Sequence, residues 1–440
     1  MISSAENNAV GYQLYDLAKE IFPICRSLTG NGTRATLNIL KRELPALSLH
    51  EVPSGTKCFD WTVPDEWNIE DAYILDPTGQ KIVDFKTSNL HVVGYSHPID
   101  TLISLEELQQ HLHSLPAQPD AIPYVTSYYA KRWGFCITHK QRLTLAPGQY
   151  HVVIKSTLCS GSLTYGELLI KGNSTEEIFL STYICHPSLA NNELSGPLVQ
   201  TGLAKWISAT QDRRYSYRLI FIPETIGSIV YLSRNMPDLK KNVVAGFNIS
   251  CVGDDRCFSF LPSRQDNSLS NRVALHVLKH LSPDFKRYTY LTRGSDERQY
   301  CSPGVNLPIA SIMRSKYGMY PEYHTSLDNL DVISPRGLQG GYDALRLSLF
   351  CLENNYIYRA VYPCEPQMGK RGLYSTITTD NDPADITAIM NLLAYADGTV
   401  DLLNIADSIN FPMWDLVQIA GILVAKGVLA QQCLEKSPLL

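Results

Sequence analysis

The sequence lacks an excess of positive charge. Its 440 residues include 38 lysines and arginines against 43 aspartates and glutamates, which gives a formal net charge of −5 at pH 7. A chain with this balance has no basic field to attract nucleic acid phosphates or an anionic membrane surface. We therefore expect neither nucleic acid nor a membrane as its partner.

Long apolar runs and a secretory leader are also missing. No stretch approaches the ~20 consecutive apolar residues that cross a bilayer. The opening residues, Met-Ile-Ser-Ser-Ala-Glu-Asn-Asn, lack a charged region followed by an apolar one. The eleven cysteines include no Cys-x-x-Cys pair, so we expect reduced, mostly buried thiols. Together these absences predict a cytoplasmic protein.

Apolar residues are plentiful, at 44% of the total, and can fill the cores of two or three domains. Strand-like and helix-like segments alternate from residue 148 to 355, which predicts a mixed α/β fold for the main domain. We assign residues 1–50 and 139–362 to this domain.

The sequence pattern changes between Glu51 and about Thr138, and this change predicts a small β-rich domain, residues 51–138, inserted into the main one. Short apolar-polar alternations there are interrupted by prolines and aromatic residues. The aromatic residues could line a binding cleft, but we favour the core of the small domain. They include Trp61, Trp67, Tyr124, Tyr128 and Tyr129.

The loop from Cys25 to Arg34 is rich in glycine, hydroxyl side chains and arginine. Such a loop could bind an anion. Two glycines alone are a weak indication, so we favour a structural turn that caps the following helix over a substrate contact.

Residues 363–440 have the pattern of a winged helix: helices over 385–402, 404–410 and 412–425, then a strand at 428–429. The third helix carries almost no positive charge, so it cannot neutralise DNA phosphates. We expect its apolar stripe to pack against the main domain or a second subunit, and a homo-oligomer through this or the inserted domain is possible on that basis. The stripe is Leu416, Ile419, Ala420 and Leu423.

The chemistry is predicted to start where a strand over residues 177–184 delivers His186 to its carboxyl end. A helix begins at Ser195, and Asn191, Asn192 and Glu193 lie at the junction between the two. In open α/β sheets ligands bind at this edge.

Three further motifs belong with His186. Glu224 directly follows a buried strand, where apolar neighbours can raise its pKa into the range of a general base, although an acid there can also cap a helix. Asp296, Glu297 and Arg298 form a short mixed cluster, which we favour as a site over a solvated face. His324 follows Tyr323 at what we interpret as a second strand end.

These motifs together resemble the zinc-dependent exopeptidases of the bacterial aminopeptidase and glutaminyl cyclase type. More closely, the chain is similar to aminopeptidase-like proteins with an inserted β domain and a C-terminal winged helix, often linked to polysaccharide or natural-product biosynthesis. The resemblance rests on Cys-His-Pro-Ser, Pro-Glu-Thr-Ile-Gly-Ser, Gly-Ser-Asp-Glu-Arg-Gln-Tyr and Glu-Tyr-His-Thr-Ser. It implies a three-layer α/β/α sandwich with a mixed sheet.

The resemblance also implies metal ligands, but the chain departs from the two-zinc pattern. Asn192 stands at the bridging aspartate, Thr225 at the second glutamate and Ser250 at the later aspartate. Neutral side chains cannot compensate two dications. We therefore predict one zinc per chain held by His186, Glu193 and His324, with Asp254 or Asp255 as alternative acids.

The predicted function is a metal-dependent, aminopeptidase-like hydrolase of an amide bond in a small specialised or peptide-like substrate. Glu224 is assigned as the general base, and Arg298 as a fork for a carboxylate. Alternatives are an amide-forming or cyclising enzyme on the same scaffold and a non-catalytic binding protein with a degenerate metal site. Substrate binding is assigned to Asn192, Asp296, Glu297, Arg298 and Tyr323.

Overall fold

The computed structural model describes residues 9–373 and 383–432. Within them the chain forms two compact units. The first comprises the residues up to 270 together with 286–343, and the second comprises 271–285 together with the residues from 344 onward.

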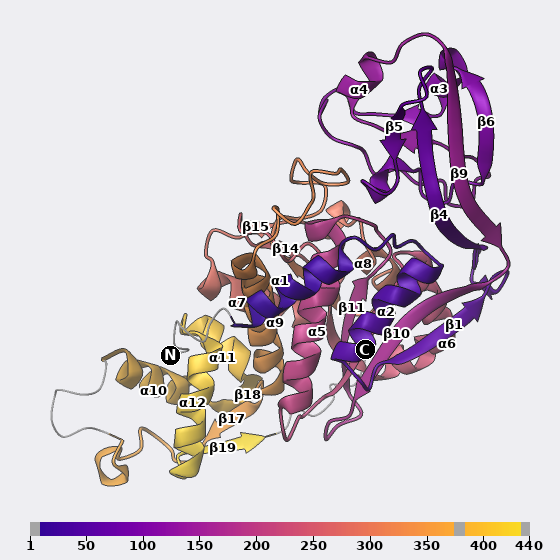
Figure 1. The fold of residues 1–440 in the computed structure, drawn as a ribbon. Helices are drawn as coiled ribbons and strands as arrows, with labels where there is room; N and C mark the ends of the chain where they lie inside the picture. The colour runs from indigo at the N-terminus through magenta and orange to yellow at the C-terminus, as the bar shows by residue number, and fades with distance from the viewer. Residues whose placement is uncertain (1–8, 374–382, 433–440) are drawn as a thin grey trace. The chain divides into compact units, whose positions relative to one another are not determined.

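An eight-stranded mixed sheet organises the first unit, in the order β1-β10-β12-β11-β13-β16-β14-β15 (Figure 1). Every residue of β11 is buried, because helices cover the centre of the sheet on both faces. This is the predicted α/β/α sandwich. The strands are β1 (Ser48–Pro53), β10 (Ser162–Ile170), β11 (Glu177–Tyr183), β12 (Ser216–Ile222), β13 (Val243–Asn248), β14 (Ser259–Leu261), β15 (Lys286–Arg287) and β16 (Ile309–Met313).

Strand direction decides where the polar residues gather. β11 runs parallel to both β12 and β13, so the carboxyl ends of these three strands meet at one edge. His186 follows β11 and Glu224 follows β12 at this edge. The helices of the unit are α1 (Ala9–Ile21), α2 (Asn31–Glu43), α5 (Ser195–Ala209), α6 (Ile226–Asn242), α8 (Glu297–Tyr300) and the first part of α9 (Pro335–Glu353).

The inserted domain lies between β1 and β10, which pair antiparallel from Pro53 opposite Ser162. Its four-stranded sheet has the order β5-β4-β9-β6. Since β9 belongs to this sheet, the domain extends beyond the expected boundary at residue 138: alternation indicates a strand but not the sheet it joins. Its main elements are β4 (Glu66–Leu75), β5 (Lys81–Asp84), β6 (Ile99–Ser104), α3 (Leu105–Gln110), α4 (His139–Leu143) and β9 (Gln149–Cys159).

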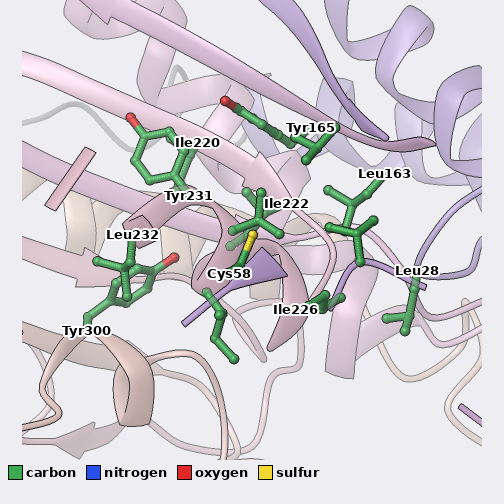
Figure 2. Packing of buried hydrophobic residues seen from close by; sticks show 14 of the residues in the cluster. Leu28, Cys58, Leu163, Tyr165, Ile220, Ile222, Ile226, Tyr231, Leu232 and Tyr300 are labelled. Carbon is green, nitrogen blue, oxygen red and sulfur yellow. The ribbon is translucent and has the colours of Figure 1, made fainter. Parts of the chain in front are cut away.

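A short hairpin of the inserted domain, β2 (Lys57–Cys58) and β3 (Trp61–Thr62), is anchored in the core of the main sheet. The buried side chain of Cys58 belongs to the same cluster as Ile222 of β12 and Ile226 of α6 (Figure 2). The hairpin is therefore held beside the strand and helix that flank Glu224.

The C-terminal residues form the predicted winged helix. Its sheet has the order β18-β17-β19. Because β17 pairs with both other strands, the domain begins before the expected boundary at residue 363. The helix predicted over residues 385–402 ends at Tyr395, because the chain then enters β18, where Gly398 has φ 89°. The elements are β17 (Ile357–Ala360), α10 (Pro383–Tyr395), β18 (Asp397–Asp401), α11 (Leu402–Ser408), α12 (Met413–Ala425) and β19 (Leu429–Gln432).

The apolar stripe of α12 is covered inside this domain. Leu416, Ala420 and Leu423 are fully buried, and α12 contacts α10, α11 and β19. Three neighbouring elements therefore shield these residues. The start of α12 also contacts α7 (Leu269–Leu281), within the range assigned to the main domain, because the Met413 amide donates to His276 Nε2 at 2.9 Å. A homo-oligomer through this domain stays a prediction. Among the described helices none is by itself long and apolar enough to cross a membrane, although α11 and α12, bent by 116°, pass that test as a pair.

We expect the full chain to show no binding to duplex DNA at low salt. The described part of α12 contains no lysine or arginine, so it offers no cation to phosphate groups. Fluorescence anisotropy of a labelled duplex, titrated with the chain, measures this directly. Tight binding that weakens steeply with added salt would contradict the expectation.

Candidate active site

A cavity of about 370 Å³ lies at the carboxyl edge of the central strands. The main domain supplies its charged and imidazole side chains, and the inserted domain supplies its tryptophan and tyrosines. The cavity is lined by Leu28, Trp61, Tyr124, Thr126, Tyr128, Tyr129, Cys185, His186, Glu224, Thr225, Ile226, Arg298 and His324. The prediction that the aromatic residues of the inserted domain form only its core is therefore partly right. Trp67 is in a buried core cluster. The cavity is lined by Trp61, Tyr124, Tyr128 and Tyr129.

His186 is only 5% exposed and follows directly from the buried end of β11. Its Nδ1 lies 3.2 Å from Cys185 Sγ, and its Nε2 lies 3.5 Å from Glu224 Oε2. Burial lowers the pKa of His186 well below its ordinary value. The imidazole is therefore neutral at physiological pH and can accept or donate a hydrogen bond in the cavity.

Glu224 occupies the turn between β12 and α6, with its side chain 20% exposed. The next residue, Thr225, has a strained backbone (φ 64°, ψ −74°), and Arg298 Nη2 donates a hydrogen bond to its hydroxyl at 2.7 Å. Burial raises the pKa of Glu224, and the negative charge of nearby Asp296 raises it further. A carboxyl group in this setting can both accept and return a proton near neutral pH.

Asp296 holds the turn that leads into helix α6. Its Oδ1 accepts hydrogen bonds from the Thr225 amide and the Ser228 hydroxyl, both at 2.8 Å. The residue at the N-cap position of α6 is Thr225, with no capping side chain, so Glu224 does not act as the helix cap. Glu224 lines the cavity instead.

His324 lies in a loop after β16 rather than at a strand end, and its backbone has φ 58°. Its carbonyl accepts a hydrogen bond from the Tyr124 amide of the inserted domain at 2.9 Å. The ring stacks on Tyr323 with centroids 3.9 Å apart and lies 5.5 Å from the ring of His186. Its buried Nε2 has no hydrogen-bond partner among the described residues, so this atom can receive a ligand.

Glu193 does not join the two histidines. Its Oε2 lies 2.9 Å from Arg26 Nη2, and both side chains are fully buried. Burial raises the pKa of Glu193 to about 7, against the opposing effect of the Arg26 charge. One carboxylate oxygen is thus held by a guanidinium, while Oε1 has no partner among the described residues. The described structure does not group Glu193 with the two histidines as the predicted metal site requires.

The two alternative acids are committed elsewhere. Asp254 accepts hydrogen bonds from Asn191 Nδ2, from the Ser315 amide and from its hydroxyl. Asp255 bonds the Ser334 hydroxyl and Arg336. In residues 9–373 and 383–432, no three histidine, cysteine, aspartate or glutamate side chains are grouped to hold a metal ion. Two imidazoles are suitable zinc donors, but without a third ligand the described residues do not fit the predicted zinc site.

Asp328 lies four residues after His324, and it was assigned no role from the sequence. Its carboxylate accepts hydrogen bonds from the amides of Asn191 and Asn192, at 2.7 and 3.0 Å, and from the Tyr320 hydroxyl at 2.9 Å. These bonds fix the turn that follows His186. No local spacing relates Asp328 to a turn so far away in the sequence, so only the pairing itself could have identified it.

The residues predicted to bind substrate separate into two groups. Arg298 lines the cavity and is exposed, as a carboxylate fork requires. Tyr323 supports the ring of His324. Asn192 and Glu297 face inward: Asn192 Nδ2 donates to the Tyr183 hydroxyl, and Glu297 accepts from Tyr317 and from backbone amides.

Stability should fall as the pH rises from about 6.5 to about 8. Glu193, Glu224 and Asp296 have raised pKa values in the folded chain, so the folded state holds protons that the unfolded state has already released. Histidines are neutral in both states above their ordinary pKa of about 6.5 and do not oppose this trend. Each retained proton contributes about 1.4 kcal/mol per pH unit. Denaturant unfolding at several pH values tests the slope, which Glu224→Gln should reduce; a flat or rising profile would contradict it.

Comparison with known proteins identifies relatives over most of the chain. A family model described as a domain of unknown function, DUF4910, matches residues 15–355, and one described as a winged helix-turn-helix matches residues 356–431. A Clostridium acetobutylicum protein named as a candidate polysaccharide biosynthesis protein with an aminopeptidase-like domain is 46% identical over 402 residues. The match covers 91% of this chain and 92% of that protein.

Solved structures show the same likeness. A crystal structure of a candidate peptidase from Clostridium acetobutylicum has a TM-score of 0.91 and 42% identity, covering 97% of this chain and 98% of its own. BSAP, a zinc aminopeptidase from Bacillus subtilis, has a TM-score of 0.56 and 13% identity, covering 79% and 94%. At that identity the likeness to BSAP concerns the fold alone.

Proposed function

We propose that this chain, which belongs to the DUF4910 family and has the aminopeptidase fold that its motifs predicted, hydrolyses an amide bond in a small substrate bound in the cavity. The observation that carries this proposal is Glu224: a carboxyl group with a raised pKa, 3.5 Å from a neutral histidine, at the wall of a cavity of substrate size. Such a group is suited to proton transfer near neutral pH.

In the proposed reaction Glu224 accepts a proton from a water molecule whose oxygen attacks the carbonyl carbon. The new carbon–oxygen bond forms as the carbonyl becomes tetrahedral. The carbon–nitrogen bond then breaks, and Glu224 returns its proton to the leaving amine. No step is assigned to zinc, since the described residues do not complete its ligand set.

Three neighbouring side chains have supporting roles in this proposal. Arg298 binds a carboxylate or the developing oxyanion, since its guanidinium reaches the cavity beside Glu224. The imidazoles of His186 and His324 also line the cavity and offer neutral donors or acceptors there. His324 is the better placed for a substrate group, because its Nε2 is unpartnered among the described residues.

The substrate is proposed to come from a polysaccharide or natural-product pathway. The relative from Clostridium acetobutylicum supports this by its name. The aromatic walls of the cavity support it by chemistry, because Trp61 and Tyr129 are 38% and 55% exposed and present ring surfaces to a ligand. Exposed aromatic rings pack against apolar and sugar-ring faces alike.

Turnover in heavy-oxygen water tests the reaction class. Aminoacyl amides, short peptides and acylated amino sugars are incubated with the full chain, and the masses of the products are measured by mass spectrometry. Hydrolysis places one heavy oxygen in the product carboxylate. Ring closure with loss of ammonia would leave the product unlabelled and favour the cyclising alternative, and tight binding without any turnover would favour a binding protein; either result would overturn the proposal.

A further inference from the structure

Arg26 is an arginine with almost no exposure, 1%, in the loop between α1 and α2. Its Nη1 donates to the Ile21 carbonyl at 2.8 Å. Its Nη2 donates both to the His186 carbonyl, at 2.8 Å, and to Glu193 Oε2, at 2.9 Å. One guanidinium therefore joins the residue before the loop, the end of strand β11 and the acid of the following turn.

A zinc ion bound between His186, Glu193 and His324 is incompatible with this arrangement. Among the described residues these three side chains are not grouped to hold a metal ion. Glu193 Oε1 has no hydrogen-bond partner among them, but Oε2 is bonded to Arg26, so an ion there would have to draw the whole carboxylate toward the histidines and away from a guanidinium that cannot release its proton. The buried guanidinium would then keep its carbonyl partners but lose its carboxylate, and its charge would repel the dication in a poorly screened interior.

We propose that Arg26 is the resident cation of this site: its guanidinium holds Glu193 and the backbone of His186 in place and excludes zinc from the position between His186, Glu193 and His324. Arg26 is a positioning residue, because it acts through Glu193 and His186 and does not line the cavity. The inference goes beyond the proposed function and holds whether or not the chain hydrolyses an amide.

Metal content and zinc-dependent melting test the proposal on the full chain, purified without chelator. We expect the parent to carry well below one zinc per chain by elemental analysis, and its melting temperature to be the same with zinc and with EDTA. Arg26→Met frees Glu193, so this variant should take up about one zinc per chain and melt at a higher temperature with zinc than with EDTA. Adding Glu193→Gln to Arg26→Met should abolish that difference.

Arg34→Met is the matched control, because Arg34 also pairs with a glutamate, Glu66, but away from the two histidines. It should gain no zinc. A parent that holds about one zinc per chain, lost on His324→Ala, would overturn the proposal. If Arg26→Met fails to fold, the parent measurements and His324→Ala decide the question by themselves.

Discussion

Glu224→Gln should lower kcat by roughly 10²- to 10⁴-fold on a confirmed substrate, because an amide can neither accept the proton of the attacking water nor return one to the amine. The substitution keeps the size and shape of the side chain. The neutral amide also removes the repulsion between Glu224 and Asp296, so the variant should be at least as stable as the parent near pH 8. The measurement is kcat and KM, together with the melting temperature.

Glu70→Gln is a suitable control, since Glu70 is an exposed glutamate on β4 outside the cavity. It should leave kcat unchanged. Should Glu224→Gln retain parental turnover while remaining folded, Glu224 would have no part in proton transfer, and the proposed mechanism would fail.

Arg26→Met should lower the free energy of unfolding by about 3–5 kcal/mol, because it leaves the Glu193 carboxyl buried without its partner. The loss should be smaller at low pH, since a protonated Glu193 carries no uncompensated charge. Denaturant unfolding in the presence of EDTA measures the change without interference from metal.

The double variant Arg26→Met with Glu193→Met should recover most of this loss, because apolar residues of similar volume often replace a buried ion pair without net cost. Arg34→Met provides the comparison for a pair that remains partly exposed, with side-chain exposures of 25% and 12%, and its effect should be smaller. Equal losses in Arg26→Met and the double variant would show that the Arg26–Glu193 pair is not the source of the effect.

The sequence predicts the fold well where a signal is local. The buried run of β11 and the helix after it can be recognised from apolar spacing alone, and so can the turn that carries His186. Glu224 and His324 were found through short motifs, and they line the same cavity as His186. Parallel strands explain why His186 and Glu224 meet, and the inserted domain explains the position of His324.

The errors arise where a residue is defined by a distant partner. Arg26 and Glu193 are separated by 167 positions, and nothing around either one indicates the other. Asp328 and the turn at Asn192 are separated by 136. The limits of the domains fail for the same reason, because the sheet that β9 or β17 joins depends on strands elsewhere in the chain. A local sequence pattern therefore identifies candidate donors of a metal site, but it cannot show which of them already pair with a charged residue elsewhere in the chain.

The position of the inserted domain has a consequence for how such a protein can change. The domain leaves and rejoins the main sheet at neighbouring positions: Pro53 lies opposite Ser162, and the Ser54 amide donates to the Gly161 carbonyl at 2.9 Å. A short β-hairpin turn would connect β1 to β10 directly at this point. The aromatic side chains that line the cavity come from the segment inserted at this junction, whereas His186 and Glu224 directly follow strands of the main sheet. Replacing one continuous segment would therefore change the aromatic wall of the cavity and leave His186 and Glu224 in place.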